Sequence, residues 1–395
     1  MSLTLLCAPL AALWLHSATA GEPAGAAQPA AAQDFAIRAA HAATGDGQHL
    51  ANVLILVQGG RLAAIGTGEL PPGIEVIEYP GWVTPGFVAA WGRLSHPAED
   101  ETTSPFLEQL DLLPGFDPHR PDVAEALRVG ITTLLPATNP TSVIAGTMPP
   151  VKLAPGPAGE VQRLPLPALL LSMASPAVNR GRAPTSYSGL VLALDQRAAD
   201  PAGRLAEAKA GRLLVSIDVE ERHEVQRAID WSATHGLRPL LRGATLAGEQ
   251  IASLQAAGVG VVLPPFGLGA SGRTLDALVA LSKSRVPFAF GYGSEASFRL
   301  PLAAALARGA DRPALERALW GGAAKLIGAD ARVGSLRAGL DADLVLWSGD
   351  PLDLSSRPER IYVGGREVYR AAPLLPSQPP KSPRLGVPTG NKHAR

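Results

Sequence analysis

Cysteine is almost absent from this sequence, because its 395 residues include a single one, Cys7. Cys7 lies in an apolar segment at the amino terminus that we expect to be removed, which would leave the mature chain with none. A chain without cysteine forms no disulfide bond, no thiolate metal site and no cysteine nucleophile. Any chemistry in the mature chain must therefore come from other side chains.

An excess of charge of either sign is also lacking, because 35 Lys and Arg residues balance 35 Asp and Glu residues. Proteins that bind nucleic acids or anionic membranes need a concentrated basic surface. The sequence has no long block of Lys and Arg. It therefore gives no support for a nucleic-acid partner.

No apolar run is long enough for a stable membrane span. Residues 3–15 are apolar and lead into Ala18-Thr19-Ala20, a small-x-small pattern typical of a signal-peptide cleavage site, although no Lys or Arg precedes the run. We expect residues 1–20 to be a cleaved signal peptide and the protein to be secreted to the periplasm or the cell exterior. Leu6 precedes Cys7 where a lipoprotein signal has a small residue, so we expect no lipid anchor.

Two further segments have the composition of unfolded chain. Residues 21–34 are rich in Ala, Pro and Gly, which predicts a flexible linker. Residues 371–395 combine Pro with Lys and Arg and show no apolar period, which predicts a disordered tail.

The rest of the chain, with 46 % hydrophobic residues overall, changes its pattern twice. Residues 35–82 alternate apolar and polar side chains between turn signals, which predicts a small β-meander. From residue 85 to about 330, strand-like runs alternate with helical stretches, as in the strand 213–217, the helix 223–235 and the strand 239–241. This alternation is typical of parallel strands joined by crossover helices.

The β pattern returns after residue 331 and includes a hairpin around Gly364-Gly365. We therefore predict an α/β fold in which residues 85–330 form a (β/α)8 TIM-like barrel. The barrel would be inserted in a small β-sandwich domain that residues 35–84 and 331–370 build together.

Three stretches carry a family resemblance. They are VTPGFV at 83–88, GITTLL at 130–135 and GSLRAGLDADLVLWSGDPL at 334–352. Together they resemble the amidohydrolase superfamily, most closely its imidazolonepropionase-like branch. The resemblance implies a barrel hydrolase that acts on carbon–nitrogen bonds and carries zinc or another divalent metal at the carboxyl ends of its strands.

The first pair of metal ligands that the resemblance implies is missing. In the family the pattern Pro-Gly-hydrophobic-hydrophobic-Asp-x-His-x-His ends the first barrel strand, and both histidines bind the metal. Here the Asp position holds Ala89 and the two His positions hold Trp91 and Arg93. Arginine stays protonated and an indole N–H only donates, so neither side chain offers a lone pair to a cation.

The other ligand positions are altered as well. The strand-5 histidine would fall near residues 215–217, which offer Ser216 or, just beyond, Asp218. The strand-6 histidine would fall at Arg242. Lys152 is the one candidate for the carboxylated lysine that some relatives use. Lys152, Asp218 and Glu295 are thus the candidates for a ligand or an acid–base role.

The last barrel strand, near residues 289–295, normally ends in an Asp that acts as general base. It supplies Tyr292 and Ser294 but no Asp, and Glu295 is the nearest carboxylate. The side chains predicted to form a pocket at the former ligand positions are Trp91, Arg93, Ser216, Arg242, Tyr292 and Ser294. The residues themselves predict no metal and no other cofactor.

Several of these residues could have purely structural roles instead. Arg93 and Arg242 could form structural ion pairs with Asp218 or Glu295, or they could bind an anion. Trp91 could simply fill a vacated metal cavity. The histidines are expected to be ordinary surface or helix residues: His96, His119, His223 and His235.

Three functions from different classes remain open. The first is a non-catalytic binding or scaffold relative in the cell envelope, paired with an active amidohydrolase paralogue or with a second copy of itself. The second is an active hydrolase of small amide or dipeptide C–N bonds with an altered metal site. The third is a binding protein for a small anionic ligand. Fold alone does not choose among them.

Overall fold

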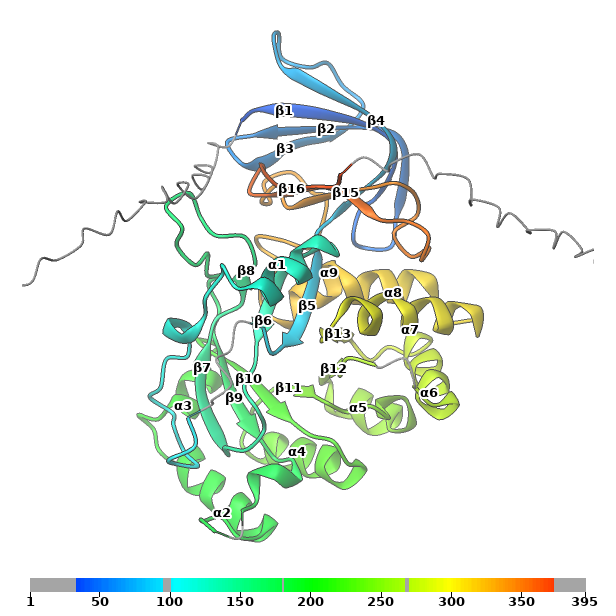
Figure 1. Ribbon diagram of the computed structural model, residues 1–395. Helices are drawn as coiled ribbons and strands as arrows, with labels where there is room; N and C mark the ends of the chain where they lie inside the picture. Colours follow the sequence, from blue (N-terminus) through cyan, green and yellow to red (C-terminus); the bar gives the residue numbers. More distant parts are fainter. Residues whose placement is uncertain (1–32, 95–100, 180, 267–269, 373–395) are drawn as a thin grey trace, which may run out of the picture.

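The computed structural model describes residues 33–94, 101–179, 181–266 and 270–372. The expected signal peptide, nearly all of the expected linker, nearly all of the expected tail and His96 lie outside the described residues. The described chain forms two sheets, a small one from both ends of the sequence and a large one from its middle (Figure 1).

The small sheet has seven strands in the order β16-β15-β14-β4-β1-β2-β3. Strand β4 lies parallel to β1 on one side and antiparallel to β14 on the other, so it joins the two ends of the chain. The first four strands are therefore not the predicted meander, and the region forms one sheet. The strands are β1 (Phe35–Ala43), β2 (His49–Gln58), β3 (Arg61–Gly66), β4 (Glu75–Pro85), β14 (Leu344–Trp347), β15 (Pro358–Val363) and β16 (Arg366–Arg370).

Alternation of side chains explains how the small sheet buries one face. On β2, Val53, Ile55 and Val57 are buried, whereas their neighbours are partly or fully exposed. Such a period of two places every second side chain on the same face of a strand. Ile37 and Leu344 join these side chains in one apolar cluster.

The large sheet has nine strands in the order β7-β9-β10-β11-β12-β13-β5-β6-β8. Seven of them, from β9 to β6 in this order, pair in parallel, and β7 and β8 pair antiparallel at its two ends. The strands are β5 (Phe87–Gly92), β6 (Ile131–Pro136), β7 (Ile144–Met148), β8 (Val151–Lys152), β9 (Ala168–Ser172), β10 (Leu214–Asp218), β11 (Pro239–Arg242), β12 (Gly260–Leu263) and β13 (Phe288–Tyr292).

Helices connect the parallel strands, as expected for crossover units. Helix α4 follows β10 and buries Val225 and Ala228, and a capping box of Glu221 and Glu224 begins it. The helices are α1 (Pro121–Arg128), α2 (Tyr187–Ala198), α3 (Arg204–Lys209), α4 (Arg222–Thr234), α5 (Ile251–Ala257), α6 (Gly272–Ser282), α7 (Glu295–Ala307), α8 (Arg312–Leu319) and α9 (Gly321–Leu326). Within the described ranges, no helix is both long and apolar enough to cross a membrane.

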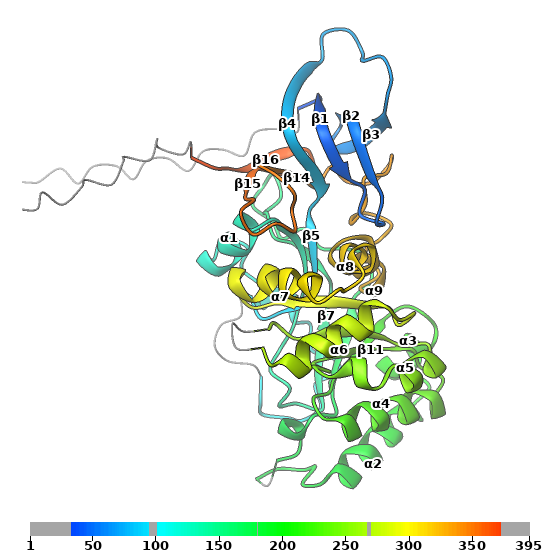
Figure 2. The ribbon, with the colours of Figure 1, turned by 90° about the vertical axis from the view of Figure 1, so that its right-hand side faces the viewer.

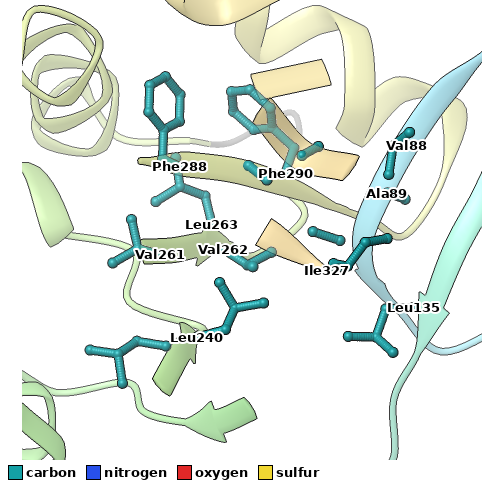
Figure 3. Packing of buried hydrophobic residues seen from close by; sticks show 14 of the residues in the cluster. Val88, Ala89, Leu135, Leu240, Val261, Val262, Leu263, Phe288, Phe290 and Ile327 are labelled. Carbon is teal, nitrogen blue, oxygen red and sulfur yellow. The ribbon is translucent and has the colours of Figure 1, made fainter. Parts of the chain in front are cut away.

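A continuous core supports the large sheet. Apolar side chains of β11, β12 and β13 pack against one another, and Ile327, which follows α9, packs with them (Figure 3). The labelled members on these strands are Leu240, Val261, Val262, Leu263, Phe288 and Phe290. Because both faces of a parallel sheet are covered, its strands are mostly apolar rather than alternating.

The chain passes from one sheet to the other at Gly86, between β4 and β5 (Figure 2). A Cβ atom on Gly86 would lie 2.0 Å from Thr132 Oγ1 on β6. Only glycine fits there, so this passage depends on the absence of a side chain.

The predicted α/β class with a separate small sheet is confirmed by this architecture. The predicted eight parallel strands are not observed among the described residues, because β7 and β8 run antiparallel beside β9 and β6. We call the edge at which the seven parallel strands end the carboxyl edge. Ligand sites of α/β folds lie at this edge.

Candidate functional site

A buried ion pair lies at the carboxyl edge. Asp218 ends β10 and Arg242 ends β11, and the two residues face each other in the strand register. Arg242 Nη2 donates to Asp218 Oδ2 at 2.8 Å, and the two side chains are 0 % and 10 % exposed. The ion pair that the sequence suggested for Arg242 is therefore present, with Asp218 as its partner.

Burial sets the protonation of this pair. It raises the pKa of Asp218 to about 6, although the charges of Arg242 and Arg93 oppose the rise. The carboxylate of Glu220 adds to it. Burial also lowers the pKa of Arg242, and Asp218 opposes that change. The pair is thus neutral overall near pH 7 and gains a positive charge when Asp218 takes up a proton in mildly acidic solution.

Most donors of Arg242 have no acceptor. Its Nε and Nη1 atoms are buried and have no hydrogen-bond partner in the described part of the chain. The hydroxyl of Ser216 on β10 and the indole Nε1 of Trp91 on β5 are buried and unpartnered in the same way. Buried polar groups normally have a partner, so each of these unpaired donors requires an explanation.

Trp91 lies where a metal-ligating histidine was expected. It faces Gly291 of β13 in the register, and a Cβ atom on Gly291 would lie 2.7 Å from Trp91 Cε3. The missing side chain at Gly291 therefore makes room for the indole. Arg93, just beyond β5, is exposed, and its charge acts on Asp218. The ends of β5 and β10 thus share one electrostatic environment.

The last strand contributes apolar packing rather than a base. Tyr292 is buried at the end of β13, and its ring contacts that of Phe298 edge-on with centroids 5.9 Å apart. Ser294 follows as an exposed residue. Glu295 begins α7, but its side chain lies outside the part of the chain that the structure describes.

Lys152 lies away from the carboxyl edge. It is 2 % exposed, and its Nζ atom lies 2.7 Å from Asp341 Oδ2 and 2.9 Å from Asp343 Oδ1. On β8 it pairs with Thr133, near the amino end of β6. The structure therefore does not bring Lys152 together with Asp218, and we drop Lys152 as a ligand or acid–base candidate.

The partners of Lys152 belong to the long carboxyl-terminal signature in the sequence. Burial alone would raise the pKa of Asp341, but hydrogen bonds and charge from Arg332 and Lys152 outweigh it and lower the pKa. Asp343 also accepts a hydrogen bond from the Gly364 amide at 2.7 Å. The Asp-Ala-Asp triplet of the signature is the sequence feature that could have indicated the partners of Lys152. It belongs to a structural network of ion pairs.

The histidines take ordinary roles. His119 is exposed. His223 contacts the Tyr187 ring edge-on, and His235 lies 2.8 Å from Asp195 of α2. None of these three belongs to a group of metal-binding side chains, because the described residues contain no set of three or more His, Cys, Asp or Glu that could hold a metal.

A divalent cation does not fit the donor chemistry of the carboxyl edge. Such a cation needs several lone-pair donors, usually neutral imidazoles and carboxylates. The described side chains there offer one buried carboxylate, Asp218, which already binds a guanidinium, whereas the neighbouring Glu220 is exposed. Arg242 and Trp91 present N–H groups, which donate and cannot coordinate. We therefore derive no reaction step through a metal.

No protein-family model matches the sequence, and no curated protein matches it either. Solved structures match the fold. An amidohydrolase from Thermotoga maritima MSB8 superimposes with a TM-score of 0.76 at 20 % identity, covering 85 % of this chain and 100 % of that one. A putative prolidase from Bifidobacterium longum has a TM-score of 0.57 at 17 % identity, covering 88 % and 97 %.

A molinate hydrolase is similar at a TM-score of 0.54 and 15 % identity, covering 87 % of this chain and 99 % of that one. At such identities the likeness shows the fold alone. The chain thus has the fold of amidohydrolases, and its function must be argued from the carboxyl edge.

Proposed function

We propose that this chain is an amidohydrolase-superfamily relative, of the imidazolonepropionase-like branch, that has lost its metal site and acts as a binding or scaffold protein. The fold likeness supports the superfamily. In this proposal β7 and β8, which end the nine-stranded sheet beside β9 and β6, occupy the place of one strand of a (β/α)8 barrel.

One observation carries the loss of the metal. The guanidinium of Arg242 lies at the position expected for a ligating histidine, fully buried and bonded to Asp218. A buried positive charge at this distance from the carboxylate repels a second cation and occupies the oxygen that would bind it. In this proposal the ion pair stands where the family resemblance places the metal of active relatives.

An active hydrolase has less support from the same residues. Without a metal, a hydrolase would need carboxylates that converge on one water molecule. Asp218 is held by Arg242, and Lys152 is held by Asp341 and Asp343. These candidates do not converge.

The proposal also covers location and partners. The apolar segment 3–15 and the Ala18-Thr19-Ala20 pattern support secretion to the periplasm or the cell exterior. There the chain would pair with a catalytic paralogue or with a second copy of itself. Mass spectrometry of the secreted protein should find Gly21 as its first residue, and an intact Met1 would contradict the signal peptide.

Metal analysis tests the central claim. The purified protein is dialysed against metal-free buffer, and its zinc, iron and manganese are measured by mass spectrometry. We expect far less than one metal ion per chain, and no hydrolysis of dipeptides or small amides when zinc is added back. One tightly held metal ion per chain would refute the proposal.

A further inference from the structure

We propose that the carboxyl edge binds a small organic carboxylate at the unpaired N–H groups of Arg242, an inference that rests on the proposed loss of the metal site. This ligand class is supported by buried hydrogen-bond donors that have no acceptor within the described chain. Side chains from three strands carry the unpaired donors: Trp91 on β5, Ser216 on β10 and Arg242 on β11.

Arg242 supplies the positive charge. Its side chain is fully buried, yet only Nη2 has a protein acceptor, and Nε and Nη1 have none. Leaving buried donors of a charged group unpaired is costly, and the cost is relieved when an acceptor arrives. An anion at Arg242 would therefore gain hydrogen bonds that the protein has already oriented.

Ser216 and Trp91 have the same deficiency. Ser216 lies two residues before Asp218 on β10, so both side chains lie on the same face of that strand. Its hydroxyl can donate, and so can the Trp91 indole, which cannot accept. Both atoms are buried and lack a partner in the described chain. The missing group is thus an acceptor rather than another donor.

A carboxylate fits this set better than a more highly charged oxyanion. A guanidinium donates in its plane to the planar oxygens of a carboxylate. Asp218 lies 2.8 Å from Arg242 and is a negative charge that a ligand must tolerate. A single negative charge on the ligand keeps that repulsion small, whereas a phosphate dianion doubles it.

The binding experiment uses the full mature chain after dialysis against metal-free buffer. Isothermal titration and thermal melting at pH 7.5 compare sodium acetate, propionate and benzoate with sodium chloride at equal ionic strength. We expect saturable binding of one carboxylate per chain and a rise in melting temperature by mass action. Sodium phosphate serves as the dianion probe, and phosphate binding tighter than any carboxylate would overturn the ligand class.

Conservative substitutions test whether the carboxylate binds at this site. Ser216→Ala and Trp91→Phe remove one donor each and should weaken carboxylate binding roughly threefold to tenfold. Arg242→Lys keeps the charge but loses the planar donors, and should weaken binding by at least about tenfold. Ser232→Ala is the matched control, because the Ser232 hydroxyl on α4 is also buried and unpartnered within the described chain. It should leave binding unchanged.

The outcomes separate this inference from the proposed function. No saturable binding, or equal effects of Ser216→Ala and Ser232→Ala, would overturn the carboxylate site while a metal-free protein still supports the loss of the metal. Carboxylate binding that a chelator abolishes would place the ligand on a metal, and would overturn both.

Discussion

At the scale of single residues, the dominant feature is a charged pair that has been taken out of water. Burial removes the hydration of Arg242 and Asp218, and their attraction to each other offsets part of that free-energy cost. Removing one partner is therefore worse than removing both. At pH 8 we expect Arg242→Met to lower the free energy of unfolding by about 3–5 kcal/mol, because it leaves Asp218 buried and unpaired.

The matched control for that variant is the double variant Asp218→Asn with Arg242→Met, which we expect to be more stable than Arg242→Met alone. Urea denaturation followed by circular dichroism gives both values. A double variant that is less stable than the single one would show that the two charges do not depend on each other.

The raised pKa of Asp218 predicts a pH dependence with a definite sign. The carboxyl titrates at about 6 in the folded protein and at its ordinary value of 3.8 in the unfolded chain, so between these values the folded state holds the extra proton. This contribution to stability is complete below pH 3.8 and is lost as the pH rises through 6. At most it amounts to about 3 kcal/mol.

The measurement compares the wild type with the Asp218→Asn, Arg242→Met double variant, which removes the group and keeps the other titrations. We expect the unfolding free energy of the wild type to fall relative to that of the double variant as the pH rises from 5 to 7.5. A flat difference over this range would contradict the raised pKa.

Residues at strand ends could be predicted from the sequence, whereas long-range partners could not. The positions of Trp91, Asp218 and Arg242 follow from where a strand ends, which is a local property. The role of Lys152 depends on Asp341 and Asp343, almost two hundred positions later, and nothing near Lys152 signals them. The unpaired hydrogen-bond donors could not be predicted from the sequence either, because the lack of a partner is a property of the folded chain.

At the scale of elements, the passage from β4 to β5 is the most constrained. Gly86 packs against Thr132 so closely that a Cβ atom would lie 2.0 Å from Oγ1 and 2.6 Å from the Thr132 Cβ. We expect Gly86→Ala to lower the free energy of unfolding by about 1–3 kcal/mol through overpacking. Thermal and urea denaturation measure the loss.

Gly68 provides the control for that substitution, because a Cβ atom there would meet nothing within 4 Å. Gly68→Ala should change the stability by less than about 0.5 kcal/mol. Equal effects of the two substitutions would mean that the contact with Thr132 does not limit the passage.

Strongly periodic elements were predictable, and short ones in irregular surroundings were not. The helix predicted over residues 223–235 corresponds to α4, and the strand predicted over 239–241 to β11. By contrast, β7 and β8 are separated only by Pro149 and Pro150, and β8 has two residues. Their antiparallel pairing depends on neighbours that the sequence does not identify, so the eightfold parallel barrel was expected in their place.

At the scale of the whole molecule, a buried lysine ties the large sheet to the small one. Lys152 of β8 reaches Asp341 and Asp343, which precede β14, and Arg332 also binds Asp341. Lys152→Met would remove the cation that lies beside Asp343 and one of the two that lie beside Asp341. We expect it to lower the free energy of unfolding by about 3–5 kcal/mol.

Lys209 of α3 is exposed, and its Nζ atom donates only to the Ala198 carbonyl at 3.0 Å among the contacts described. Lys209→Met is therefore the matched control and should cost less than about 0.5 kcal/mol. Chemical denaturation of both variants decides the matter, and similar losses would exclude a special role for the tie.

The pairing of β4 with β14 has a consequence for folding during synthesis of the chain. β4 leaves the ribosome long before β14, on the order of tens of seconds earlier at ordinary rates of synthesis. During that interval the backbone amides and carbonyls on one side of β4 are unpaired, and they can pair with strands of other nascent chains. We therefore expect that a holding chaperone, or slow synthesis of new chains, limits this pairing until the final strands are made.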